Sequence, residues 1–283
     1  MKRVAIQGFE GSYHDIATRL FFKEEETELI CCETFGEVFD ALAADNDVVA
    51  LVAIENTIAG SLLHNYELLR GSGMAIVGEQ KLRIAHCICC LPDEDWADLH
   101  EVHSHPVALA QCETFLQRHP ELKAVQAEDT ALCAKKIKEQ QLRGHAAICS
   151  VPAANLYGMR ILQENIETNK HNFTRFLVVA DRWKADEMRA EGIGKQPDKA
   201  NIVFSLPHEE GSLSQILSIF TFYRINLTKI QSLPMIGREW EYMFYVDVTF
   251  DDYTRFRQSI DAVRPLTKEL SILGEYKAFE NNR

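Results

Sequence analysis

The chain has 283 residues, and at roughly 150 residues per domain this length predicts two domains. Hydrophobic residues make up 46% and charged residues 25%, which is typical of a globular protein with a full hydrophobic core. The 42 acidic and 30 basic residues give a net charge of −12, which disfavours binding to nucleic acid or to anionic membranes.

Export and membrane insertion are also disfavoured. No apolar run approaches the roughly 18 residues that a membrane-spanning helix needs. The apolar segment after the basic amino terminus ends at Gln7, which is too short for an export signal. All eight cysteines precede residue 150, and adjacent pairs such as Cys31-Cys32 make a poor disulfide framework. We therefore expect a cytoplasmic protein with free thiols.

Strand-like and helix-like segments alternate up to about residue 180. The run Val48–Ile54 (VVALVAI) is continuously apolar, as expected for a strand that is buried on both faces. Alternation of this kind predicts an α/β domain with a largely parallel sheet. Strands are expected at 4–6, 48–54, 84–91, 146–150 and 174–180, and helices at 12–22, 58–69 and 106–118.

The remainder of the chain has a different pattern. Residues 181–199 are rich in charges and include Gly192, Gly194 and Pro197, which predicts a solvated linker. The order βαββαβ is then expected, which is that of a ferredoxin-like domain. Its strands are expected at 201–206, 227–234, 242–249 and 269–275, and its helices at 212–223 and 253–265.

Two polar turns follow predicted strands. The first, Gly8–Tyr13, has two glycines that allow close backbone approach to an anion, but it lacks the third glycine of a dinucleotide site and the lysine of a P-loop. Glu10 would also repel a phosphate, so an ordinary tight turn is the favoured interpretation. The second, Ile54–Ser61, lies at the carboxyl end of the buried strand, where α/β folds bind ligands. Its Asn56 or Thr57 is equally suited to cap a helix.

Two further segments contain reactive residue types. In Val102–Gln111, Pro106 at the first position of a helix places Ser104 beside the positive helix end. His103 and His105 are zinc-ligand types, but no third ligand lies nearby in the sequence, so no metal site is expected. The second segment, Asn172–Val179, begins a very apolar strand with Thr174 and Arg175, and the arginine fork suits a carboxylate. A solvated arginine is the simpler interpretation.

Together these segments resemble the prephenate dehydratase family along nearly the whole chain. The motifs occur in the family's order: GxxGSY at 8–13, IENTIxGS at 54–61, SHPxALxQC at 104–112, AAxxSxxAAxLYG at 146–158 and NxTRF at 172–176. A regulatory ACT domain comes last. The resemblance implies a monofunctional, cytoplasmic lyase of phenylalanine biosynthesis that converts prephenate to phenylpyruvate, carbon dioxide and water.

The resemblance also implies a domain organisation. A catalytic domain at 1–180 is expected to have two lobes like a type II periplasmic binding protein, about 1–76 with 160–180 and about 77–159, around a cleft. The linker at 181–199 and an ACT domain at 200–283 follow.

By family analogy, the hydroxyl of Thr174 donates a proton to the departing hydroxide, and Arg175 anchors a substrate carboxylate. Catalytic hydrogen bonds are expected from Asn56, Ser104 and Gln111. Further substrate-binding positions are Gly11, Ser12, Thr57, Glu128 and Phe176. No cofactor and no metal are implied.

In the family, phenylalanine binds the ACT domain through two elements, and homodimers or homotetramers form through this domain. The first element is Gly211, Ser212 and Leu213 here, a mild change from the family's GAL. The second follows Asn226 and Leu227 and reads Gln231-Ser232-Leu233-Pro234 instead of ESRP, so its two charges are lost. Trp240-Glu241-Tyr242 and Asp247 still match. Feedback by phenylalanine is therefore a weaker expectation than the fold.

Three alternatives remain open. Arogenate dehydratase catalyses the same reaction on an amino-acid analogue of prephenate, and the sequence does not separate the two substrates. A non-catalytic amino-acid sensor would have no need of Thr174. A zinc or thiol enzyme would depend on His103, His105 and the cysteines.

Overall fold

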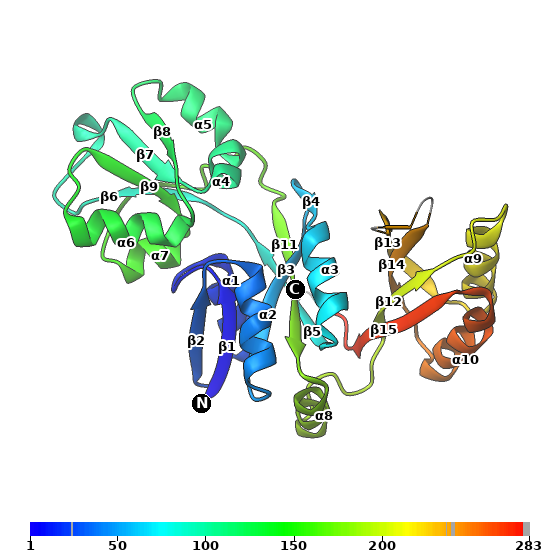
Figure 1. Ribbon diagram of the computed structural model, residues 1–283. Helices are drawn as coiled ribbons and strands as arrows, with labels where there is room; N and C mark the ends of the chain where they lie inside the picture. Colours follow the sequence, from blue (N-terminus) through cyan, green and yellow to red (C-terminus); the bar gives the residue numbers. More distant parts are fainter. Residues whose placement is uncertain (24, 236, 239–240, 280–283) are drawn as a thin grey trace. The chain divides into compact units, whose positions relative to one another are not determined.

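The computed structural model describes residues 1–23, 25–235, 237–238 and 241–279 (Figure 1). Its contacts divide the chain into two compact units, one made of residues 1–62 and 80–176 and the other of 63–79 and 177–283. Among the described residues, no helix is long and apolar enough to span a membrane. The mixed α/β class predicted from the sequence is confirmed.

The first sheet of the first unit has the strand order β11-β3-β1-β2, in which β1 is parallel to both β2 and β3. Its strands are β1 (Lys2–Gln7), β2 (Thr27–Cys32), β3 (Val49–Asn56) and the first half of β11 (Phe173–Ala180), and the short β4 (Gly60–Ser61) pairs with β3. Helices α1 (Tyr13–Phe22) and α2 (Phe35–Ala44) begin at the side-chain caps Ser12 and Thr34. Residues 49–54 are all buried, as the apolar run predicts.

The second sheet of this unit has the order β10-β6-β9-β7-β8. β7 is parallel to β8 and β9, whereas β6 is antiparallel to β9 and β10. One face packs on α6 and α7, and the other packs on α4 and α5. The elements are β6 (Cys87–Cys90), β7 (Glu101–Ser104), α4 (Pro106–Gln111), α5 (Glu113–Arg118), β8 (Lys123–Gln126), α6 (Thr130–Gln140), β9 (His145–Cys149), α7 (Val151–Leu156) and β10 (Arg160–Glu164), with a 3-10 turn at Trp96–Asp98.

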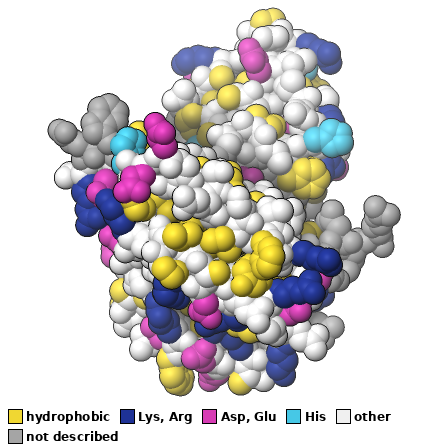
Figure 2. Space-filling model, turned by 90° about the vertical axis from the view of Figure 1, so that its right-hand side faces the viewer, with side chains coloured by type: hydrophobic (Ala, Val, Ile, Leu, Met, Phe, Trp, Pro, Cys, Tyr) yellow, Lys and Arg dark blue, Asp and Glu magenta, His cyan; other side chains and the backbone are white. Residues whose placement is uncertain are grey.

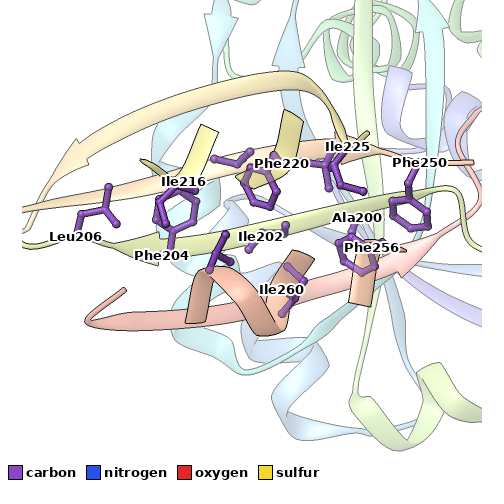
Figure 3. Packing of buried hydrophobic residues seen from close by; sticks show 13 residues of the cluster. Ala200, Ile202, Phe204, Leu206, Ile216, Phe220, Ile225, Phe250, Phe256 and Ile260 are labelled. Carbon is purple, nitrogen blue, oxygen red and sulfur yellow. The ribbon is translucent and has the colours of Figure 1, made fainter. Parts of the chain in front are cut away.

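The second unit contains the predicted ferredoxin-like βαββαβ arrangement, with the antiparallel order β13-β14-β12-β15. Helices α9 and α10 bury the same sheet face, and the phenylalanines of this core are visible in Figure 3. β15 also pairs in parallel with β5 where Gly274 lies opposite Ile76. The elements are α3 (Leu63–Ser72), β5 (Ala75–Arg83), α8 (Arg182–Glu191), β12 (Lys199–Ser205), α9 (Ser212–Phe222), β13 (Asn226–Pro234), β14 (Tyr242–Thr249), α10 (Tyr253–Val263), a 3-10 turn (Arg264–Leu266) and β15 (Glu269–Tyr276).

Several expected boundaries differ from the structure. The segment expected to be a solvated linker contains α8, because Ala185 and Met188 give this charged stretch a buried face. The helix expected from residue 58 begins at Leu63, since Ile58 lies exposed in the preceding turn. The helix expected over 106–118 is divided at Cys112 into α4 and α5. Residues 160–164, which are expected in the first lobe, form β10 and pair with β6 of the second sheet.

Acidic and basic side chains are interspersed on the face that Figure 2 draws. Figure 2 shows one face on which both kinds surround a group of hydrophobic side chains. In the second unit, the large apolar side chains with high exposure include Phe222 of α9 and Ile230 of β13.

Candidate active site

Thr174 and Asn56 form a hydrogen-bonded pair where the end of β3 meets the start of β11. The Nδ2 of Asn56 donates to Thr174 Oγ1 over 2.9 Å and to Asn172 Oδ1 over 2.8 Å. Both residues of the Thr174–Asn56 pair are more than 90% buried. Because Asn56 fills an acceptor position of the Thr174 hydroxyl, the hydroxyl proton is left to point elsewhere. Among the hydrogen bonds of the described residues, none is donated by the Thr174 hydroxyl.

The backbone around this pair is fixed by further hydrogen bonds. The Oδ1 of Asn56 accepts from the amides of Ile58 and Ala59 at 2.9 Å each, as the capping interpretation of this turn predicts. Thr57 joins the two strands, because its amide donates to the Phe173 carbonyl and its hydroxyl accepts from the Phe173 amide. Thr57 itself is exposed. The geometry of Asn56 is therefore set before any ligand binds.

Asn172 is a polar residue of this cluster that the sequence-based site did not include. It is fully buried, and its Nδ2 has no hydrogen-bond partner among the described residues. A buried amide without a partner is costly, and such groups commonly indicate a missing ligand or water. Its position at the start of the NxTRF motif was the signal that could have identified it.

Arg175 and Phe176 are adjacent in the NxTRF motif, so their side chains lie on opposite faces of β11. Successive side chains of a strand point to opposite faces, so Arg175 leaves the sheet on the other face from Thr174. Arg175 is 9% exposed and lies 3.7 Å from Glu55 Oε2, whose neighbour Asn56 holds Thr174. Phe176 is buried in the core and packs edge-on against the ring of His14, which does not place it at a substrate surface.

The turn between β1 and α1 contacts the start of α7, a helix that packs on the second sheet. Ser12 caps α1, but the amide of Gly11 is already occupied by the carboxylate of Asp15 at 2.7 Å. The Gly11 carbonyl accepts from Ser150 Oγ over 2.9 Å. A Cβ at Gly11, which has φ +86°, would lie 3.0 Å from Ala153 Cα. Glycine is thus required here for close approach of α1 and α7.

Asp129, rather than its neighbour Glu128, faces this turn. A Cβ at Gly8 would lie 2.8 Å from Asp129 Oδ2 and 3.5 Å from Ser12 Oγ. Asp129 caps α6 with its other oxygen, and burial raises the pKa of its carboxyl. Glu128, which family analogy selected, has an 85% exposed side chain and lies 3.9 Å from Lys136. A one-residue difference in register on a loop explains why the sequence favoured Glu128.

Gln111 belongs to a polar chain that also includes His86 and Tyr13. The Oε1 of Gln111 lies 2.9 Å from His86 Nε2, and the other ring nitrogen lies 2.8 Å from the Tyr13 hydroxyl. Burial lowers the pKa of His86, which favours the neutral imidazole. Ser104 is fully buried and donates to the Ile148 carbonyl at 2.6 Å, so its proton is already used within the protein.

Among the hydrogen bonds of the described residues, His103 and His105 are bonded to groups other than cysteine thiols. All eight cysteines are free thiols, as predicted, and seven of them are buried. His105 caps α4 by accepting from the Val107 amide, and burial lowers its pKa. His103 pairs instead with His145 of β9.

The residues expected to bind phenylalanine lie on two elements of the ferredoxin-like part. Gly211, with φ +80°, immediately precedes α9, and Ser212 and Leu213 are the first two residues of this helix. Asn226, Leu227, Gln231 and Ser232 lie on β13, an edge strand of the sheet. Gln231 donates to the Ser232 carbonyl at 3.2 Å. Trp240, which also matches the family pattern, lies outside the described residues.

His14 predicts a pH dependence of stability. It is buried between Phe35 and Phe176, its Nε2 has no partner among the described residues, and burial lowers its pKa to about 4. The unfolded chain, with a histidine pKa near 6.5, binds the proton more readily than the folded chain. The contribution of neutral His14 to the free energy of unfolding is therefore complete above about pH 6.5 and is lost as the pH falls towards 4. At pH 5 the loss from this residue is about 2 kcal/mol.

The measurement is urea unfolding of the wild type and of His14→Leu at pH 5 and pH 8. The fall in unfolding free energy between the two pH values should be about 2 kcal/mol smaller in the variant. Equal falls in the two proteins would contradict a buried neutral His14.

The fold and the polar cluster at β3 and β11 define a mixed α/β protein with a candidate site at the carboxyl end of a largely buried strand. The sequence model described as prephenate dehydratase matches residues 4–184. The chain therefore belongs to the prephenate dehydratase family, whose members are lyases of phenylalanine biosynthesis.

Curated relatives carry two different substrate names. The bifunctional chorismate mutase/prephenate dehydratase of Escherichia coli K12 is 30% identical over 279 residues, covering 97% of this chain and 70% of that protein. Arogenate dehydratase 2 of Petunia hybrida is 35% identical over 290 residues, covering 97% of this chain and 71% of that protein.

Solved structures are similar over almost the full length. A protein described as GqqA, a quorum quenching acylase, aligns with a TM-score of 0.85 and 28% identity, covering 99% of this chain and 100% of that one. Prephenate dehydratase of Arthrobacter aurescens in complex with L-Phe aligns with a TM-score of 0.84 and 24% identity, covering 97% and 89%. The latter likeness concerns the fold alone.

Proposed function

We propose that the chain converts prephenate to phenylpyruvate, carbon dioxide and water. The observation that carries this proposal is the Thr174 hydroxyl, which is held by Asn56 and donates none of the hydrogen bonds of the described residues. A proton donor that is oriented through its acceptor side is what departure of a hydroxide requires.

The chemistry needs little beyond positioning and this donor. Prephenate has a carboxylate and a hydroxyl on opposite sides of a cyclohexadiene ring, and loss of both makes the ring aromatic. The thermodynamic drive is therefore large, and the protein must mainly fix the ring and its two carboxylates. Hydroxide is so basic a leaving group that even an alcohol can protonate it when correctly placed.

We propose Asn56, Thr174 and Gln111 as the polar groups nearest the reacting atoms. Asn56 and Thr174 form the donor pair. Gln111 is hydrogen-bonded to His86, which in turn is hydrogen-bonded to Tyr13. Ser104, Ser12, Gly11, Thr57 and Phe176 are proposed to shape the site through the backbone and packing contacts described above. Glu128 stays a proposal from the family pattern.

Arg175 is proposed from the family motif to supply positive charge for a dianionic substrate in an acidic protein. Because its side chain leaves β11 on the face opposite Thr174, it would reach a substrate carboxylate from that other face. We expect Arg175→Ala to raise the KM for prephenate about tenfold to a hundredfold, the equivalent of the 1.5–3 kcal/mol typical of a hydrogen bond to a charged group. The turnover number should change less. Steady-state kinetics on prephenate measures both.

Glu55→Gln and the double variant serve as controls, because Glu55 lies 3.7 Å from Arg175. If Arg175 binds the substrate, the double variant keeps the high KM. Recovery of a normal KM in the double variant would show that Arg175 only neutralises Glu55.

The preferred substrate is tested by a parallel assay on prephenate and arogenate. We expect the higher kcat/KM with prephenate, and a preference for arogenate would change the substrate while leaving the reaction unaltered. The same preparation can be assayed for release of a carboxylic acid from an N-acylated amino compound. We expect no such acylase activity, because the cluster offers a proton donor and no paired nucleophile and base.

We further propose that the division into a catalytic part at 1–180 and an ACT domain at 200–283 is functional, with a connecting segment at 181–199. The ACT domain would bind L-phenylalanine near α9 and β13 and would join copies of the chain into a homodimer or homotetramer. The phenylalanine complex of the Arthrobacter enzyme and the exposed Phe222 and Ile230 support this proposal.

Isothermal titration with L-phenylalanine tests the regulatory site. We expect weak binding by the wild type and about tenfold tighter binding by a variant with Gln231→Glu and Leu233→Arg, which restores the two charges of the family motif. No heat from either protein at millimolar phenylalanine would contradict a regulatory site on β13.

A further inference from the structure

Glu101, His103 and His145 form a cluster on the second sheet that the proposed reaction does not use. Glu101 and His103 lie two positions apart on β7, so their side chains share one face of the strand. His145 starts the neighbouring parallel strand β9 and pairs in register with Glu101. Three metal-ligand types from two strands therefore converge at one point.

The ligand atoms are close enough to bind one ion. His103 Nε2 lies 2.8 Å from His145 Nδ1 and 3.4 Å from Glu101 Oε2, and His145 Nδ1 lies 3.7 Å from the same oxygen. In a tetrahedral zinc site with bonds of about 2.0–2.1 Å, ligand atoms are about 3.3 Å apart. The three separations bracket this value, so little movement is needed.

The surroundings leave these atoms available and hold them in place. Lys123 binds the other carboxylate oxygen, Oε1 of Glu101, at 3.1 Å and so orients Oε2 towards the histidines. The ring of His100 packs edge-on against His145 with 5.4 Å between centroids. The three side chains are 20–24% exposed, which allows an ion to enter and leaves room for a water as fourth ligand.

We propose that Glu101, His103 and His145 form a binding site for a divalent transition-metal ion, with Zn²⁺ as the best-fitting ion. Two imidazoles and one carboxylate are a donor set that suits zinc and disfavours calcium and magnesium, which take oxygen ligands. In the absence of metal, a hydrogen bond between the two histidines occupies one imidazole lone pair. Metal binding replaces the shared proton of that bond.

The site is separate from the candidate active site. Val102 and Ser104 point to the opposite face of β7, where Val102 packs in the core with α4 and α5. The metal ligands lie instead on the face that carries Ala147 and the α6–α7 core. The ion would therefore join β7 to β9 and stabilise this lobe, without contacting substrate.

The test uses the purified full-length chain, treated with a chelator and then dialysed. Titration with Zn²⁺ by calorimetry should give one site per chain with a Kd below about 10 µM. Binding to the folded state should also raise the Tm. Co²⁺ should give a visible spectrum typical of tetrahedral nitrogen and oxygen ligands, without the intense near-ultraviolet bands that a cysteine thiolate produces.

Variants identify the ligands. We expect His145→Ala and His103→Ala each to weaken Zn²⁺ binding at least about thirtyfold and to remove the Tm increase, and Glu101→Gln to weaken it about tenfold. The matched control is His119→Ala, which removes a histidine paired with Glu121 elsewhere on this lobe and should leave binding unchanged. No binding by the wild type, or wild-type affinity in His145→Ala, would overturn the proposal. Circular dichroism confirms that each variant is folded.

Discussion

Thr174→Ala should lower the turnover number for prephenate by a factor of about 10²–10⁴, the usual contribution of a positioned general acid. The substitution removes the hydroxyl that Asn56 holds at 2.9 Å, together with the γ-methyl group. The KM should change little, because the hydroxyl acts on the leaving group in the transition state. Steady-state kinetics with phenylpyruvate detection measures both parameters.

Two matched variants separate chemistry from packing. Thr174→Ser keeps the hydroxyl and should retain part of the activity, whereas Thr174→Val keeps the shape and should be as inactive as Thr174→Ala. The free energies of unfolding of all three variants should lie within about 1–2 kcal/mol of the wild-type value, because each variant loses at most one buried hydrogen bond. A fully active Thr174→Ala enzyme would remove this residue from the mechanism.

Lys199→Met should destabilise the second unit by about 3–5 kcal/mol, because it leaves a buried carboxylate without its countercharge. Lys199 Nζ binds both oxygens of Glu79, at 3.0 and 2.8 Å, and the two side chains are only 7% and 1% exposed. The pair joins the start of β12 to β5. Urea unfolding followed by circular dichroism measures the loss.

The control is the apolar double variant Glu79→Leu with Lys199→Met. Since replacement of both partners removes the stranded charge, the double variant should be much closer to the wild type than either single variant. If both single variants were as stable as the wild type, the pair would not be an integral part of the fold.

The fold was largely predictable where the hydrophobic pattern is strong. The apolar run that became β3 is buried along both faces, and residues 242–249 form β14 with the predicted bounds. The order βαββαβ followed from alternation of periods of two and 3.6 residues. Elements with weak patterns were missed, such as β8, whose four residues include none that is fully buried. The sequence predicts a linker in place of α8, because only Ala185 and Met188 give this charged helix a buried face.

The candidate site was predictable as far as local motifs allow. Asn56 and Thr174, which two separate local motifs select, form a hydrogen bond although 118 residues separate them. Register and long-range contacts were not accessible. Asp129 faces the turn at Gly8 where Glu128 was selected, and Arg175 points away from Thr174 because a strand alternates its faces.

The metal-type cluster illustrates the same limit. The sequence offered His103 and His105 without a third ligand, and no metal site was expected. In the structure His105 caps α4, and His103 instead meets His145, which is 42 residues away along the chain and one strand away in the sheet. Parallel pairing of β7 with β9 brings the two together, and only the fold contains that information.

The most direct test of the proposed function is phenylpyruvate formation from prephenate by the purified protein in the presence of a chelator. We predict a rate far above that of uncatalysed prephenate breakdown, unaffected by the chelator, and reduced at least a hundredfold in Thr174→Ala. No formation of phenylpyruvate above background by the folded wild-type protein would contradict the proposed dehydratase reaction.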